Sequence, residues 1–331
     1  MNLVHRSAVC LALLAPLAAQ GPATTLLAGC QRAAVVVRAT VLAATDPSPE
    51  WHRLSLRSDE VLKGTVGATF ELLEPAGACC GRSLFALQPG QHCLLFLQRT
   101  GAVLHPFGGS RGVLADEPDL VQAVRDLLGA ATDAARAQRL VGQLQHGDPR
   151  VAADAAQALA TLPTLALAGN DRDALGAALL TALQRRATTA APLLDAVVRL
   201  QDPALLDQLL PAYLATERDD QARLLRRGLC RVSLPMLTER LPMFVGGDDG
   251  RQLRAAELLA DLPAAETMPA LQNLVQTTGC PRVKLCASEA LLAGGASAAS
   301  LAPFVPEAIL ELAQRRGRTP RTFRSIRPGQ P

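Results

Sequence analysis

The sequence predicts a small β-barrel followed by an α-solenoid of helical hairpins. Residues 22–116 alternate apolar and polar side chains with a period near two, and from residue 117 onward the period changes to 3.6. Similar helical segments then recur at intervals of roughly 30 residues, which is typical of stacked helical hairpins. A chain of 331 residues with 49% hydrophobic side chains is large enough to form a core in each part.

The first 19 residues predict a secretory signal peptide. His5 and Arg6 precede an apolar run from Ala8 to Ala19, and small residues end that run. The run is shorter than the roughly 18 apolar residues that a membrane-spanning helix needs, so we expect cleavage after Ala19. The sequence therefore predicts an exported protein, periplasmic or extracellular.

Five short strands are expected between residues 22 and 116, with turn signals between them. The expected strands are Ala33–Val41, Trp51–Leu56, Ala68–Leu73, Cys93–Leu97 and Gly101–Phe107. The turn signals are Asp46-Pro-Ser-Pro, Lys63-Gly64, Pro75-Ala-Gly77 and Pro89-Gly90. Strands of this length and spacing favour a small barrel or a sandwich.

Four motifs in this segment resemble the netrin-module family of OB-like barrels, which includes the tissue inhibitors of metalloproteinases. They are an early Cys30, the stretch Glu60-Val-Leu-Lys-Gly64, Cys80-Gly81, and Gly90-Gln-His-Cys-Leu-Leu-Phe-Leu97. The resemblance covers about residues 28–115. It implies an OB-like fold in which the early cysteine is joined by a disulfide to the middle of the barrel.

The cysteines are expected to be structural, because export places them in an oxidising compartment. Cys30, Cys79, Cys80 and Cys93 allow three pairings, and a bond between the adjacent Cys79 and Cys80 would be strained. Two pairings remain open: Cys30 bonds to Cys79 or to Cys80, and Cys93 bonds to the other one. A further local bridge is expected between Cys280 and Cys286.

No signature of catalysis, metal binding or cofactor binding is found in the sequence. Zinc sites favour cysteine pairs two to four residues apart. Cys79 and Cys80 are adjacent, as are His92 and Cys93, and adjacent residues of a strand point to opposite faces, so they cannot bind one metal ion together. Phosphate loops and the common hydrolase motifs are absent. The sequence thus predicts a protein that is not an enzyme and has no cofactor. The alternative is a thiol-active or Cys/His enzyme in the β segment that uses His52, His92 or His105.

From Glu117 to Arg316 the helical segments resemble short HEAT-like repeats. Asp148–Pro163 (DPRVAADAAQALATLP), Asp248–Pro263 (DDGRQLRAAELLADLP) and Cys280–Leu292 (CPRVKLCASEALL) share an opening arginine and an Ala- and Leu-rich end. Related helices are expected near Thr188 and Asp219. We expect Asp148 and Asp248 to cap their helices, and Pro149 and Pro281 to occupy first helical positions.

The predicted function is non-catalytic binding of a protein partner by the solenoid surface. Arg150, Arg251 and Arg282 are the candidate contact residues, because each lies near the start of an expected inner helix. Nucleic acid is not expected as a partner, since the net charge is only +3. Residues 317–331 form a basic tail with few helix-forming features. A further alternative to the binding function is a membrane-associated module of an envelope assembly, which would use this tail.

Overall fold

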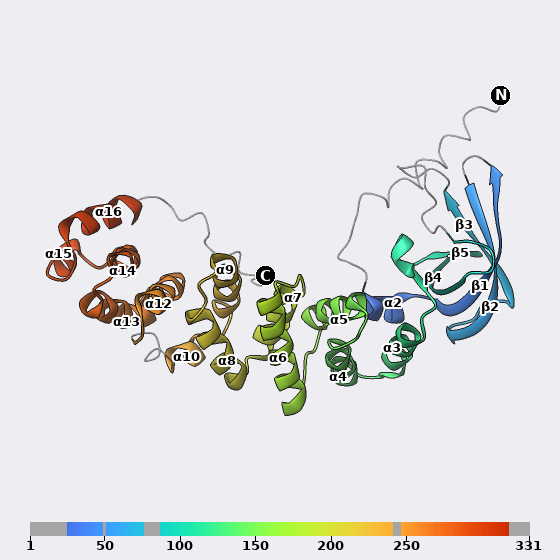
Figure 1. The fold of residues 1–331 in the computed structure, drawn as a ribbon, viewed down its shortest axis with the longest axis horizontal. Helices are drawn as coiled ribbons and strands as arrows, with labels where there is room; N and C mark the ends of the chain where they lie inside the picture. The colour runs from blue at the N-terminus through green and yellow to red at the C-terminus, as the bar shows by residue number, and fades with distance from the viewer. Residues whose placement is uncertain (1–24, 49–50, 76–86, 241–245, 318–331) are drawn as a thin grey trace, which may run out of the picture. The chain divides into compact units, whose positions relative to one another are not determined.

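The computed structural model describes residues 25–48, 51–75, 87–240 and 246–317. The signal peptide, Cys79, Cys80 and the tail from residue 318 lie outside the described residues. The chain divides into two compact units after Leu167, and each unit is described by itself. The expected order of a β part followed by a helical part is confirmed (Figure 1).

The first unit contains a curled antiparallel sheet with the strand order β3-β2-β1-β4-β5, and β6 also pairs with β4. Its strands are β1 (Val35–Ser48), β2 (Trp51–Lys63), β3 (Thr69–Pro75), β4 (His92–Thr100), β5 (Val103–Pro106) and β6 (Val113–Ala115). The short 3-10 helix η1 (Gly109–Gly112) precedes β6. The sheet curls enough that β3 and β5, at opposite ends of the strand order, contact each other.

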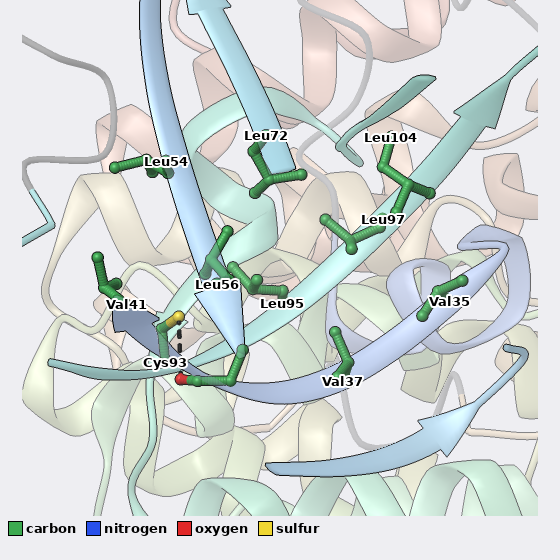
Figure 2. Packing of buried hydrophobic residues seen from close by; sticks show 11 residues of the cluster. Val35, Val37, Val41, Leu54, Leu56, Leu72, Cys93, Leu95, Leu97 and Leu104 are labelled. Carbon is green, nitrogen blue, oxygen red and sulfur yellow. Dashed lines mark hydrogen bonds between the residues drawn. The ribbon is translucent and has the colours of Figure 1, made fainter. Parts of the chain in front are cut away.

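Strand β1 is the longest strand and pairs with both β2 and β4. Its register against β2 shifts at four places, and such bulges bend a strand and increase its twist. The bend encloses a core of alternate residues, with Val37, Leu56 and Leu95 among those that are fully buried (Figure 2). This core lies on the concave face of the sheet, as the alternation of apolar residues predicts.

All five expected strands are present, and the turns at Lys63-Gly64 and Pro89-Gly90 are confirmed. Gly64 has a φ of +76°, and a Cβ at this position would lie 2.2 Å from the carbonyl oxygen of Ala34. Only glycine fits such a position without strain. The observed β1 and β2 extend well beyond the expected strands, which end at Val41 and Leu56.

A helix that the sequence analysis did not anticipate, α2 (Leu26–Arg32), precedes the sheet. Its first turn is capped by Thr25, whose hydroxyl oxygen accepts a hydrogen bond from the backbone N–H of Ala28 at 3.2 Å. It packs closely on β4, since a Cβ on Gly29 would lie 2.8 Å from the ring of Phe96. The helix thereby covers part of the outer face of the sheet.

Three further helices complete the first unit: α3 (Pro118–Gly129), α4 (Asp133–Gln143) and α5 (Pro149–Thr161). Helix α2 contacts both α3 and α5. The strands give way to helices between Ala115 and Pro118, close to the expected boundary at residue 117. The compact unit nevertheless continues to Leu167, because α2 ties the first helices to the sheet.

The second unit is entirely helical in its described residues. Its helices are α6 (Gly169–Arg185), α7 (Ala190–Leu200), α8 (Pro203–Leu214), α9 (Asp219–Leu229), α10 (Leu234–Thr238), α12 (Asp249–Asp261), α13 (Ala264–Thr277), α14 (Pro281–Ala293), α15 (Ala298–Leu301) and α16 (Glu307–Gly317). Helices α7, α9, α12 and α14 pack in succession, while α6 packs on α8. Each of these contacts joins helices of successive hairpins.

The expected helix starts are confirmed. The carboxylates of Asp148 and Asp248 accept hydrogen bonds from the backbone N–H groups of Arg150 and Arg251, at 2.8 and 2.9 Å. Caps of this kind each contribute about 1 kcal/mol to helix stability. Proline occupies the first helical position of α5 and α14, where no N–H donor is needed.

Candidate functional site

Cys93 lies inside the curled sheet and is structural. Its Sγ donates to the carbonyl oxygen of Ala39 at 3.5 Å, among fully buried apolar side chains (Figure 2). Burial, together with the negative charges of Asp116 and Asp59, raises the pKa of the Cys93 thiol to about 12. Such a thiol is protonated at neutral pH and is a poor nucleophile.

Cys30 lies in α2, on the side that faces α3. Its Sγ donates to the carbonyl oxygen of Val124 at 3.9 Å. Burial raises the pKa of the Cys30 thiol to about 12, despite the opposing positive charge of Lys63. The structure describes Cys30 and Cys93 as free thiols, while Cys79 and Cys80 lie outside the described residues. The pairing within the β segment therefore stays a prediction.

The expected bridge between Cys280 and Cys286 is not formed, because Cys280 is a free thiol. Cys280 is the N-cap residue of α14, and Cys286 lies six residues further along the same helix. A rise of 1.5 Å per residue separates them by about 9 Å along the helix axis. A disulfide requires Cα atoms closer than about 7 Å, so a continuous helix excludes the bond.

His92 and Cys93 lie on opposite faces of β4, so they do not form a catalytic pair. The His92 side chain is 60% exposed, and its Nδ1 lies 3.1 Å from Oγ1 of Thr40. That hydroxyl donates to Oδ2 of Asp59 at 2.6 Å, and Arg57 donates to Oδ1 at 3.1 Å. Burial by itself would raise the pKa of Asp59, but these hydrogen bonds outweigh burial and lower the pKa. The result is an ionised carboxylate with satisfied partners on the outer face of the sheet.

No group of three His, Cys, Asp or Glu side chains in the described ranges is arranged to hold a metal ion.

The stretch Glu60-Val-Leu-Lys-Gly64 has structural roles. Glu60 accepts hydrogen bonds from Arg38 and Arg125, at 2.9 and 2.7 Å, and so links β2 to β1 and α3. Lys63 Nζ donates to the carbonyl oxygens of Cys30 and Gln31, at 2.8 and 3.0 Å, near the C-terminal end of α2. A lysine here satisfies carbonyls that the helix itself leaves unpaired and complements the helix dipole.

Arg150, one of the three candidate contact residues, lies at the junction of α5 with the sheet. Its Nη2 donates to the carbonyl oxygen of Arg111 in η1 at 3.2 Å, and its positive charge acts on the carboxyl group of Asp154. Asp154 in turn accepts a hydrogen bond from the backbone N–H of Leu26 at 3.2 Å. This part of α5 therefore holds the start of α2 within the first unit.

Arg251 and Arg282 lie in the second unit, both exposed in the first turns of α12 and α14. Helix α12 packs on both α9 and α14. Arg254 on α12 donates to Asp219 of α9 at 2.7 Å. This hydrogen bond chiefly lowers the pKa of Asp219, and the charges of Arg223 and Arg282 lower it further. We call Arg223, Arg251, Arg254 and Arg282 the arginine edge.

The sequence analysis named Asp219 only as the start of a helix and missed Arg223 and Arg254, although a signal for the ion pairs exists. Ion pairs between successive hairpins of this unit join residues 30 to 36 positions apart, close to the repeat length. They include Arg172–Asp202, Asp195–Arg231, Asp207–Arg240, Asp219–Arg254 and Arg226–Asp261. An arginine and an acid that recur at the repeat spacing therefore identify contacts between neighbouring repeats.

Comparisons of the chain with protein-family models, curated proteins and solved structures found no match. Function is therefore inferred from the residues and contacts described above.

Proposed function

We propose that this chain is an exported, non-catalytic binding protein, in which an OB-like barrel precedes a HEAT-like solenoid that binds a protein partner. The observation that carries the proposal is the arginine edge. Arginines from three successive helices, α9, α12 and α14, gather around one exposed carboxylate, Asp219. A stacked repeat that places cations from several units side by side suits an extended partner with acidic side chains.

The strand order supports the OB-like assignment of the first unit. β1 pairs with β2 and β4, β4 pairs with β5, and β3 contacts β5. A bent first strand shared by two neighbours and a nearly closed five-stranded arrangement are typical of this fold. The fold alone does not indicate a ligand, because OB-like barrels serve many functions.

The packing of α6 to α16 supports the solenoid assignment. Each helix of the succession α7, α9, α12 and α14 contacts the next. The ion pairs between these hairpins join residues that are separated by similar numbers of positions in the sequence. Small residues at Ala255 and Ala256 are completely buried on α12, which allows a close approach of its neighbours. Units of this kind bury their apolar faces only by stacking on one another.

Export is supported by the pattern of Met1–Ala19 in the sequence. Among the described residues, no helix is both long enough and apolar enough to cross a membrane. The thiol-enzyme alternative loses support from Cys30 and Cys93, whose buried thiols have raised pKa values. The basic tail and its role at a membrane stay predictions, because residues 318–331 lie outside the described part of the chain.

Affinity capture tests the proposal. The full-length protein, purified as exported, is used to capture partners from the exported fraction after mild crosslinking. We expect Arg251→Glu combined with Arg282→Glu to reduce recovery of a specific partner at least tenfold, since the charge of the edge is reversed. Arg185→Glu, in the last turn of α6, is the matched control and should leave recovery unchanged. Equal recovery by all three proteins would contradict the proposed surface.

A further inference from the structure

We propose that a groove between α3 and α4 in the first unit binds a cationic side chain, lysine or arginine, of a partner peptide. The groove has a volume of about 610 Å³. Its lining includes Asp119, Gln122, Asp126, Arg139, Gly142 and Gln143. None of these residues belongs to the arginine edge, so this site is independent of the proposed solenoid surface.

The two walls of the groove follow from helical spacing. On α3, Asp119, Gln122 and Asp126 are three and four residues apart and therefore share one face. On α4, Arg139 and Gly142 are three residues apart and share one face, and His146 lies three residues beyond the end of the helix. Because α3 contacts α4, the two polar faces border a common space.

The groove is open where α4 has no side chain. Gly142 lies in the last turn of α4, and a Cβ at this position would meet no atom within 4 Å. Its φ is not in the left-handed region, so neither packing nor backbone geometry requires glycine here. Glycine inside a helix costs about 0.5–1 kcal/mol relative to alanine. The absent side chain keeps the groove accessible.

A buried acceptor without a partner lies in the wall of the groove. Gln143 is only 7% exposed, and its Nε2 donates to the carbonyl oxygen of Ala123 at 3.1 Å. Its Oε1 is buried and accepts no hydrogen bond. Leaving such a group unpaired costs about 1–3 kcal/mol. The oxygen is closed to solvent, so a donor on a ligand removes this cost only after the Gln143 side chain turns toward the groove.

The charges of the groove indicate which donor fits. The carboxylates of Asp119 and Asp126 outnumber the single guanidinium of Arg139. Asp126 accepts one hydrogen bond from Gln122 at 2.9 Å, which leaves further lone pairs for a ligand. His146 uses Nδ1 to accept the backbone N–H of Asp148 at 3.0 Å. Unfilled acceptors and an excess of carboxylate favour an ammonium or guanidinium group, which donates from every nitrogen.

Two small probes test the site on the full-length protein. N-acetyl-arginine-N-methylamide carries the guanidinium, and N-acetyl-citrulline-N-methylamide is its neutral isostere. We expect the arginine probe to shift the backbone amide resonances of Gln122, Gly142 and Gln143 in a saturable way at millimolar concentrations. The citrulline probe should bind at least tenfold more weakly, since it lacks the charge. Absence of saturable shifts, or equal binding of the two probes, would overturn the proposal.

Two variants localise the binding. Gly142→Leu fills the groove and should abolish binding, whereas Gly129→Leu, where a Cβ also meets no atom, should not change it. Asp126→Asn should weaken binding about tenfold, while Asp133→Asn, whose carboxylate pairs with Arg136, should not. If Gly142→Leu fails to fold, the two aspartate variants test whether the probe binds in the groove. Unchanged affinity in Asp126→Asn, or equal losses in both aspartate variants, would exclude the groove as the site.

Discussion

Arg38 donates from Nε and Nη2 to both carboxylate oxygens of Asp116, at 2.8 and 2.9 Å. The same guanidinium donates to Glu60 at 2.9 Å, and Glu60 also accepts hydrogen bonds from Arg125 of α3. One side chain of β1 thus connects β2, the residue after β6 and the first helix of the chain's helical part. These polar contacts join the helices to the sheet, as the apolar contact between α2 and β4 also does.

Replacement of Arg38 should destabilise the first unit. Asp116 has a side chain that is only 7% exposed, so Arg38→Ala leaves an almost buried carboxylate without its main partner. We expect a loss of about 2 kcal/mol in the free energy of unfolding, measured by urea denaturation. Arg53→Ala removes the exposed pair with Glu71, 3.7 Å apart, and should cost about 0.5 kcal/mol or less. Similar losses in the two variants would contradict the role of the network.

The same network predicts a pH dependence. The hydrogen bond from Arg125, followed by that from Arg38, lowers the pKa of Glu60 in the folded protein below its ordinary value. The stability contributed by ionised Glu60 is therefore present above the ordinary glutamate pKa and is lost as the pH falls through the folded-state pKa. Glu60→Gln should be less stable than the wild type at pH 7, and the difference should shrink as the pH falls below the ordinary glutamate range. A difference that stays constant across this range would contradict the assignment.

The contribution of Asp154 to the pH dependence of stability should have the opposite sign. Burial raises the pKa of its carboxyl group in the folded protein, so stability is lost as the pH rises from the ordinary aspartate range through the folded-state pKa. Asp154→Asn keeps an oxygen that can accept the N–H of Leu26 and removes the buried charge. We expect it to match or exceed wild-type stability at pH 7, with the difference vanishing in acid. Asp154→Leu, which loses the hydrogen bond, should be about 1 kcal/mol less stable than the asparagine variant.

A pair of glycine variants separates steric overlap from backbone strain. Gly64 and Gly101 both have positive φ, but a Cβ meets the backbone of Ala34 only at Gly64. Gly101→Ala should therefore cost about 1–2 kcal/mol through the left-handed backbone alone. Gly64→Ala should cost more, because the start of β1 must also move. Equal thermal unfolding midpoints for the two variants would contradict this account.

The sequence predicted the elements whose signals are local. Period-two alternation located the strands, and the Asp-Pro and Asp-Asp starts located α5 and α12 together with their capping residues. Cap and turn geometry depends on residues three or four positions apart, so one sequence is sufficient to identify it. The strand ends were underestimated because bulges in β1 interrupt the alternation.

Features that depend on tertiary contacts were not predictable in this way. Helix α2 has only seven residues, and its stability comes from packing on Phe96 and from the cap that Lys63 provides at its C-terminal end. The bridge between Cys280 and Cys286 was inferred from spacing without allowing for the helix that separates them. The orphan oxygen of Gln143 has no sequence signature, since its burial results from the contact of α3 with α4.

Mass spectrometry of the mature protein from producing cells, after alkylation of reactive thiols under native conditions, tests the central claim most directly. The account predicts an N-terminus at Gln20 and no native alkylation of Cys30 or Cys93, whose thiols are buried and have pKa values raised to about 12. Retention of Met1–Ala19 in a cytoplasmic product with a rapidly alkylated thiol among residues 22–116 would contradict an exported scaffold.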